Sequence, residues 1–410
     1  MNYSKRRNKL FDKMEDGSLL LLYSGVAPHA SADAYYDFRV NRNFFYLTGL
    51  SRENMILMMR KNAGRTETVL YIEPTDPHTE RWTGRMVKAS EAEEITGIGD
   101  IRYVDKFERT VNMIIAPGVS TLYMDLYLHS PDDMPDYNLI KANELRAKYP
   151  GVTLRSFCPF VTEQRMAKDE DELALMNKAI NCTDAGLKNV LKNLKPGSFE
   201  YQAQADFEYT LMRMGADGTS FPTIAGSGMN GTMMHYETNR DVCEDGTLIL
   251  LDLGCRWQGY CSDITRTYPV NGKYSERQKA VYDIVLAANR KVAEAAKPGM
   301  TLRELNDICK QVLAEGCIKL GLIKDESEIG KYYMHSVSHH LGIDVHDVTV
   351  PGSVLAPGNV ITDEPGLYID EWETGIRIED DLLITEDGCV CMSEGIMRTT
   401  DEIEAFMKDR

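Results

Sequence analysis

The sequence predicts an α/β domain over residues 1–160, followed by an α+β domain with an internal duplication over residues 161–410. Three observations support this division. At 410 residues the chain is too long for one ordinary hydrophobic core, so two domains are expected. Strand-like and helix-like segments alternate in the first part, which is typical of an α/β domain. In the second part, the order helix, Lys-Pro-Gly, helix and acidic hairpin occurs twice, which indicates a duplicated half.

The first domain is expected to alternate short helices with buried strands. Helical patterns cover residues 4–14, 88–97 and 106–115. Apolar strand patterns cover residues 18–24, 44–48, 54–59, 68–72 and 121–125. Residues 156–166, which include Pro159, are expected to link the two domains. The first domain contains no glycine-rich phosphate loop and no nucleophile elbow, so by itself it indicates no function.

The composition argues against nucleic-acid and membrane partners. The formal net charge of −17 disfavours general nucleic-acid binding, because phosphate affinity comes from Lys and Arg. No apolar run reaches the length of a membrane span, and the leucines after Asp16 do not form a signal peptide. Nine cysteines without a Cys-x-x-Cys pair form neither a disulfide framework nor a zinc cluster. Reduced thiols and a cytoplasmic location are therefore expected.

The second domain begins with the first of two similar halves. Residues 169–191 and 275–296 each predict a long helix followed by Lys-Pro-Gly, and residues 201–214 and 302–320 predict the next helix of each half. Two tripeptides alone can match by chance, but the repeated order of elements favours duplication. Two halves folded about a pseudo-twofold axis would bring their acidic hairpins to one shared centre.

The first acidic hairpin carries Asp252 within an apolar strand and Asp263 after a turn. If the chain turns around Trp257 and Gln258, the two carboxylates lie opposite each other in an antiparallel pair, where like charges repel. A cation between them would remove this repulsion. The hairpin alone leaves a second interpretation open, in which Asp263 caps a turn and Asp252 pairs with an arginine.

The second acidic hairpin, residues 360–368 with 376–385, carries Glu364 and Glu379. Shortly before it come four of the eight histidines, in an irregular segment: His335, His339, His340 and His346. These histidines could be a chance surface cluster, or one imidazole could join the carboxylates as a metal ligand. Four carboxylates would balance two divalent ions, and their hard oxygens favour Mn²⁺, with Co²⁺, Fe²⁺ or Zn²⁺ possible. Two such ions would activate a water molecule for hydrolysis.

Five segments in this order resemble the ligand motifs of the pita-bread metallopeptidases, the family of methionine aminopeptidase, Xaa-Pro aminopeptidase and prolidase. They are Leu-Asp-Leu-Gly at 251–254, Ser-Asp-Ile-Thr-Arg-Thr at 262–267, Ser-His-His-Leu-Gly at 338–342, Glu-Pro-Gly at 364–366 and Gly-Ile-Arg-Ile-Glu-Asp at 375–380. Residues 39–49 resemble a motif in the N-terminal domain of aminopeptidases P and prolidases, which methionine aminopeptidases lack. The resemblance implies a pita-bread second domain and a proline-specific aminopeptidase that releases any N-terminal residue preceding proline. A prolidase, which cleaves dipeptides only, is the alternative, and a metal-free pseudoenzyme or binding module is a more distant one.

The resemblance also implies roles for individual residues. The metal ligands would be Asp252, Asp263, His339, Glu364 and Glu379, with Asp263 and Glu379 bridging two ions. Glu364 would also move a proton during catalysis. His235 and His346 would bind the substrate and its reacting carbonyl, and Arg377 would orient a ligand carboxylate with Tyr368 nearby. His340 is expected to face away, and a homodimer or homotetramer acting on peptides with proline at position two is implied.

Overall fold

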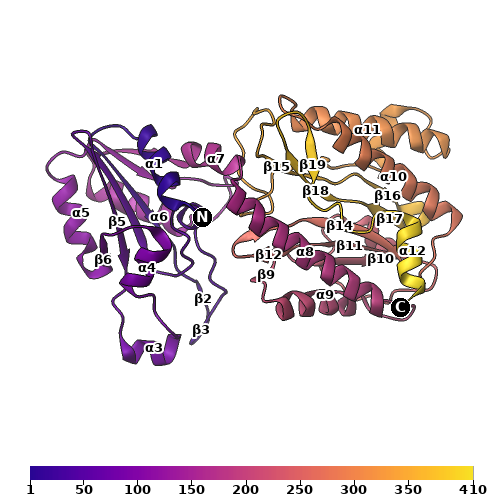
Figure 1. Cartoon of the computed structure of the whole chain (residues 1–410), viewed down its shortest axis with the longest axis horizontal. Helices are drawn as coiled ribbons and strands as arrows, with labels where there is room; N and C mark the ends of the chain where they lie inside the picture. Colours follow the sequence, from indigo (N-terminus) through magenta and orange to yellow (C-terminus); the bar gives the residue numbers. More distant parts are fainter. Residues whose placement is uncertain (410) are drawn as a thin grey trace. The chain divides into compact units, whose positions relative to one another are not determined.

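The computed structural model describes residues 1–409, which form two compact units, Met1–Gln164 and the remainder from Arg165 (Figure 1). Among these residues, no helix is both long and apolar enough to cross a bilayer.

The first unit is built on a mixed six-stranded sheet with strand order β6-β5-β4-β1-β7-β8. Its strands are β1 (Ser18–Tyr23), β4 (Ile56–Asn62), β5 (Arg65–Ile72), β6 (Ile101–Tyr103), β7 (Thr121–Met124) and β8 (Thr153–Ser156). Its helices are α1 (Tyr3–Lys13), α2 (Arg42–Thr48), α3 (Pro77–Thr83), α4 (Ala89–Thr96), α5 (Phe107–Ile115) and α6 (Tyr137–Lys148). A two-stranded ribbon joins β2 (His29–Ser31) to β3 (Ala34–Tyr35). All six residues of β1 are buried, because it lies inside the sheet.

One local prediction for this part of the chain is wrong. Residues 44–48 form most of helix α2 rather than a strand, because the Asn41 side chain accepts a hydrogen bond from the Phe44 N–H and Gly49 ends the helix at a φ of 75°. Residues 158–166, within the segment predicted to link the two domains, form helix α7 (Cys158–Met166), and the division between the two units falls inside this segment. Pro159 lies in the first turn of α7, where a missing N–H costs no intrahelical hydrogen bond.

The second unit contains two halves with the same order of elements. The first half has α8 (Glu170–Asn193), α9 (Glu200–Met214), β9 (Gly218–Thr219), β10 (Ile224–Ser227), β11 (Leu248–Leu253), β12 (Cys255–Trp257), β13 (Tyr260–Cys261) and β14 (Ile264–Pro269). The second has α10 (Glu276–Ala295), α11 (Leu302–Lys319), β15 (Val360–Asp363), β16 (Gly366–Ile369), β17 (Thr374–Arg377), β18 (Asp380–Ile384) and β19 (Cys389–Cys391), and α12 (Thr400–Lys408) ends the chain. The strands lie between the two pairs of helices and share one hydrophobic core with them (Figure 1).

The long helices of this unit begin where the sequence supplies caps. Asp169 accepts a hydrogen bond from the Glu172 N–H at 3.0 Å, and the Glu172 carboxylate accepts one from the Asp169 N–H. Ser275 with Gln278 forms the same reciprocal pair at the start of α10. These capping boxes satisfy N–H groups that a helix start would otherwise leave unpaired.

The first acidic hairpin has a different register from the predicted one. Gln258 and Gly259 form its two-residue turn, both with positive φ, as a type I′ turn requires. The turn is centred one residue later than expected, so Asp252 pairs with Thr265 rather than with Asp263. Asp263 precedes Thr265 by two residues, so by strand alternation the two carboxylates share a face as diagonal neighbours.

The second acidic hairpin keeps a single register along its length. Asp363 pairs with Asp380 in β15 and β18, and Gly366 pairs with Arg377 in β16 and β17. The same register sets Glu364 and Glu379 directly opposite each other at the break between these strand pairs.

Candidate metal centre

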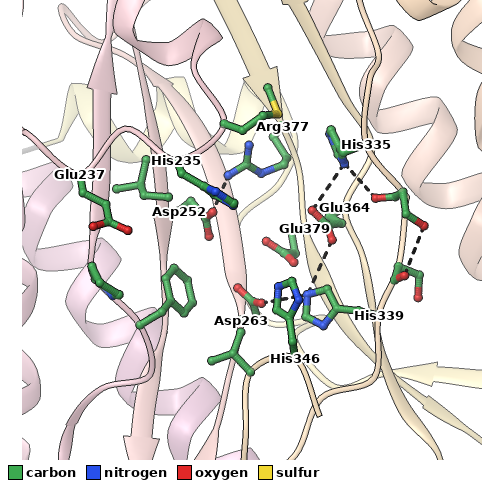
Figure 2. Close-up of a pocket in the computed structure, with 17 residues that line it drawn as sticks. His235, Glu237, Asp252, Asp263, His335, His339, His346, Glu364, Arg377 and Glu379 are labelled. Atoms are coloured by element: carbon green, nitrogen blue, oxygen red, sulfur yellow. Dashed lines mark hydrogen bonds and ion pairs between the residues drawn. The ribbon is translucent and has the colours of Figure 1, made fainter. Parts of the chain in front are cut away.

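Both acidic hairpins and the histidine segment contribute to one cavity of about 550 Å³ in the second unit. Asp252 lies near the end of β11, and Asp263 immediately precedes β14. Glu364 and Glu379 come from the second hairpin, and His339 comes from the irregular segment before it. Figure 2 shows these five side chains directed toward a common centre. They line the cavity together with His235, His335, His346 and Arg377.

The distances within this cluster are short enough for shared ligands. Ligand atoms of Asp263, His339 and Glu379 all lie within 4.8 Å of one another. The Nε2 atom of His339 lies 3.4 Å from Asp263 Oδ2 and 3.7 Å from Glu364 Oε1. The Nδ1 atom of His339 lies 3.1 Å from the His340 carbonyl oxygen, which can only accept a hydrogen bond. Nδ1 therefore carries a proton, and Nε2 is the nitrogen that faces the carboxylates.

Protonation of the cluster reflects the burial of several like charges. Burial raises the pKa of Asp263 to about 6 and that of Glu364 to about 7, with neighbouring carboxylates adding to the shift. The pKa of Glu379 is raised well above its ordinary value for the same two reasons. Burial opposes the charge of His339, but its contacts with Asp263 and Glu364 raise its pKa to about 9. The cluster therefore favours bound positive charge.

The donor set fits divalent cations. Four carboxylates and one imidazole nitrogen face the cavity, and hard cations bind such oxygen-rich sites. Asp252 Oδ1 is buried and has no hydrogen-bond partner among residues 1–409. An unpaired buried carboxylate oxygen is costly, and a metal ion would satisfy it.

Arg377 connects three parts of the cluster. Its guanidinium donates to Asp252 Oδ2 at 2.5 Å, to the Tyr368 hydroxyl at 2.9 Å and to Thr265 Oγ1 at 3.0 Å. Thr265 in turn donates to Glu379 Oε2 at 2.7 Å. The arginine partner considered for Asp252 therefore exists, but it occupies only Oδ2 and leaves Oδ1 facing the site. Thr265 was not among the predicted site residues, although its position two after Asp263 in a strand placed it on the same face.

The histidines differ in their surroundings. His335 lies 2.8 Å from both the Ser336 carbonyl oxygen and the Tyr368 hydroxyl, so its Nδ1 donates and its Nε2 accepts. Burial lowers the pKa of His335 to about 4, which keeps it neutral. The His346 ring stacks on His339 with centroids 4.0 Å apart, and His235 lines the opposite part of the cavity. His340 is buried and does not line the cavity, in agreement with its predicted orientation.

Glu200 holds the segment that carries His235. This role of Glu200 was not predicted from the sequence. Its carboxylate is fully buried at the start of α9. It accepts five hydrogen bonds of 2.7–3.0 Å, from Ser227 N, Ser227 Oγ, Asn230 Nδ2, Tyr236 OH and Asp241 N. The donors surround His235 in sequence, so Glu200 fixes this wall of the cavity. No local pattern reveals such partners, because they lie about 27 to 41 residues away.

A second unpredicted group holds the histidine segment. Asp347 is buried and accepts from Arg165 at 2.5 Å and from Lys168 at 3.2 Å. Its own N–H donates to the His340 carbonyl at 2.8 Å, which closes the loop between His339 and His346. A Cβ at Gly342 would lie 2.2 Å from Asp347 Oδ2, so only glycine fits there.

Two family models match the chain. Residues 174–386 match the description Metallopeptidase family M24, and residues 3–123 match Aminopeptidase P, N-terminal domain. The chain is 32% identical to the Xaa-Pro aminopeptidase of Escherichia coli (strain K12), over 99% of this chain and 97% of the relative.

Solved structures are similar along the whole chain. A Bacillus anthracis protein provisionally described as an aminopeptidase P has 43% sequence identity and a TM-score of 0.97, covering 100% of this chain and 98% of that one. Aminopeptidase P from Escherichia coli, solved with the inhibitor Pro-Leu, has 32% identity and a TM-score of 0.90, covering 100% and 98%. The predicted α/β first domain and pita-bread second domain are confirmed by these matches.

Proposed function

The chain belongs to metallopeptidase family M24 and acts as an Xaa-Pro aminopeptidase, and we propose that five of its side chains hold two divalent metal ions for this reaction. The convergence of four carboxylates and His339 Nε2 on one cavity carries the proposal. Asp263 comes from the first acidic hairpin and Glu379 from the second, and these two carboxylates would bridge both ions. Asp252 would bind one ion, and His339 with Glu364 would bind the other. Hard oxygen donors with a single imidazole favour Mn²⁺, and Co²⁺, Fe²⁺ and Zn²⁺ suit the same donors.

When bound, the ions would lower the pKa of a water molecule and polarise the scissile carbonyl. Glu364 is the proposed proton carrier, because its carboxylate lies between His339 and His335, at 3.7 and 3.8 Å. It would take a proton from the attacking water and deliver it to the proline nitrogen as the bond breaks. Proline nitrogen has no hydrogen within the peptide bond, so this delivered proton makes it a leaving amine.

The remaining proposed roles concern position and charge. Arg377 would hold Asp252 and, through Thr265, Glu379 in the orientation that binding requires. Tyr368 was predicted to bind substrate, but it is buried and does not line the cavity, so it would act by supporting Arg377 and His335, which do. His235 and His346 line the cavity from opposite walls and would bind the substrate, His346 at the reacting carbonyl.

The proposed substrates are peptides with proline at position two. The Escherichia coli relative is an Xaa-Pro aminopeptidase, and a Pro-Leu dipeptide inhibits an aminopeptidase P of similar fold. A prolidase would cleave only Xaa-Pro dipeptides. We propose in addition a homodimer or homotetramer in the cytoplasm; light scattering that gives a monomer would contradict the assembly.

The test uses chelated enzyme, reconstituted with Mn²⁺ and given Xaa-Pro dipeptides and longer Xaa-Pro peptides. We expect metal-dependent release of the free first residue from both, with two ions bound per chain by elemental analysis. Cleavage of dipeptides alone would identify a prolidase. Fewer than one bindable ion per chain would contradict the metal centre.

A further inference from the structure

One wall of the cavity carries a carboxylate that the metal centre does not use. Glu237 lines the cavity near an apolar group formed by Phe221, Pro222, Ile224 and Met234. Figure 2 shows Glu237 on the side of Asp252 and His235, away from His339 and His346. It is exposed and has no hydrogen-bond or ion-pair partner among residues 1–409. Its charge is therefore available to a bound molecule.

The direction of the substrate follows from the position of its free end. An aminopeptidase substrate has a free α-amino group and a single residue before the scissile bond. This end must lie within one residue of the proposed metal ions, and Asp252 is the proposed metal ligand on the side of Glu237. Ile224 is the strand partner of Asp252, so the apolar wall begins next to this carboxylate. The side chain of the first residue would then extend along that wall toward Glu237.

From this arrangement we propose that Glu237 gives the enzyme a preference for a basic first residue, Lys or Arg. The inference rests on the proposed function and adds the class of first residue. Long basic side chains carry an aliphatic stem and a charged end. Phe221, Pro222 and Met234 would contact the stem, and the Glu237 carboxylate would pair with the ammonium or guanidinium group. A neutral or acidic first residue would leave Glu237 without a partner.

The test compares peptides that differ only at the first residue: Lys-Pro, Arg-Pro, Met-Pro and Glu-Pro with the same following sequence. For the wild-type enzyme we expect kcat/KM to be about two- to fivefold higher for Lys-Pro than for Met-Pro, as expected for a solvent-accessible ion pair. Glu237→Gln should bring the ratio of the Lys-Pro value to the Met-Pro value close to one. Glu237→Lys should reverse the order in favour of Glu-Pro. Glu386→Gln, at an exposed carboxylate that does not line the cavity, is the matched control and should retain the wild-type ratio.

Three results would overturn the inference. An unchanged ratio of kcat/KM between Lys-Pro and Met-Pro in Glu237→Gln would show that the carboxylate does not bind the side chain of the first residue. An equal loss for every peptide would show that Glu237 binds the α-ammonium instead. A loss that appears only when lysine stands at position three, tested with Ala-Pro-Lys peptides, would assign the carboxylate to the other end of the substrate. Failure of the wild-type enzyme to cleave any of these peptides would overturn the proposed function as well, whereas cleavage with an unchanged ratio overturns this inference alone.

Discussion

Asp263 is the residue on which the proposed metal pair depends most. It is almost fully buried, lies 3.4 Å from His339 Nε2 and belongs to the compact ligand group with Glu379. Asp263→Ala should lower kcat by about a thousandfold or more, because several kcal/mol of transition-state stabilisation depend on the ions. Steady-state kinetics with saturating Mn²⁺ would measure this loss. Turnover within tenfold of wild type, in a variant with an unchanged circular dichroism spectrum, would contradict the bridging role.

Replacing Tyr368 by phenylalanine removes a single oxygen atom beside the same cluster. Its hydroxyl lies 2.9 Å from Arg377 and 2.8 Å from His335. Tyr368→Phe should reduce kcat/KM by about ten- to a hundredfold, as expected when a partner of a ligand-orienting group is lost. The number of bound ions, measured by elemental analysis, should not change. A variant that loses the ions would instead make Tyr368 essential for metal affinity.

At the scale of elements, Glu200 links the start of α9 to the wall that carries His235. In Glu200→Gln, the side-chain NH₂ would meet donors that now bond to a carboxylate oxygen, so buried N–H or O–H groups would lose their partner. We expect a loss of about 1–3 kcal/mol in the free energy of unfolding. We also expect KM to rise more than kcat falls, because the wall binds substrate and the ions lie elsewhere. Denaturant unfolding and kinetics at saturating metal would measure the two effects. An increase in stability would contradict this account.

Sequence patterns predicted some elements well and failed where the position of a cap or a turn was misjudged. The helices with capping boxes, such as α8 and α10, lie close to their predicted ranges because their caps are local. Residues 44–48 were predicted as a strand because Phe and Tyr favour strands, but the Asn41 cap and Gly49 enclose a helical turn. The first hairpin was misaligned because the turn falls at Gln258 and Gly259, and a shift of one residue in a turn moves the pairing by two.

The candidate site also contains residues that the sequence predicted and residues that it did not. Motif order led to the carboxylates and to His339, which do lie around one cavity, whereas their individual roles stay predictions. Thr265, Glu200 and Asp347 were missed because their partners lie far away in sequence. Contacts between residues far apart in sequence also join the two acidic hairpins. Arg266 is fully buried, pairs with Asp380 at 2.8 Å and donates to the Glu379 carbonyl at 2.6 Å.

For the whole molecule, the acidic cluster predicts how stability depends on pH without metal. The raised pKa of His339, about 9, means that the folded protein keeps a proton that the unfolded chain releases near 6.5. Stability from this group is fully present below pH 6.5 and is lost as the pH rises through about 9. Glu364, with its pKa raised to about 7, acts in the same direction at the lower end of this range. His335 and His340 act in the opposite direction, but only below pH 6.5, since their pKa values are lowered to about 4.

The chelated protein should therefore lose on the order of 1–2 kcal/mol of unfolding free energy between pH 6.5 and 8. Thermal unfolding in the presence of chelator would follow this loss as a falling Tm. His339→Asn should flatten the dependence, and saturating metal should flatten it in the wild-type protein. A Tm that rises with pH over this range would contradict the electrostatic description of the cluster.

The continuous register of the second acidic hairpin limits where the chain can change in length. Glu364 and Glu379 face each other only while both arms of the hairpin keep the same number of residues. One residue inserted within either arm would turn the next carboxylate to the opposite face, because successive side chains alternate. The tip at Asp370–Trp372 lies beyond both arms, so a loop or tag inserted there would leave the carboxylate pair aligned.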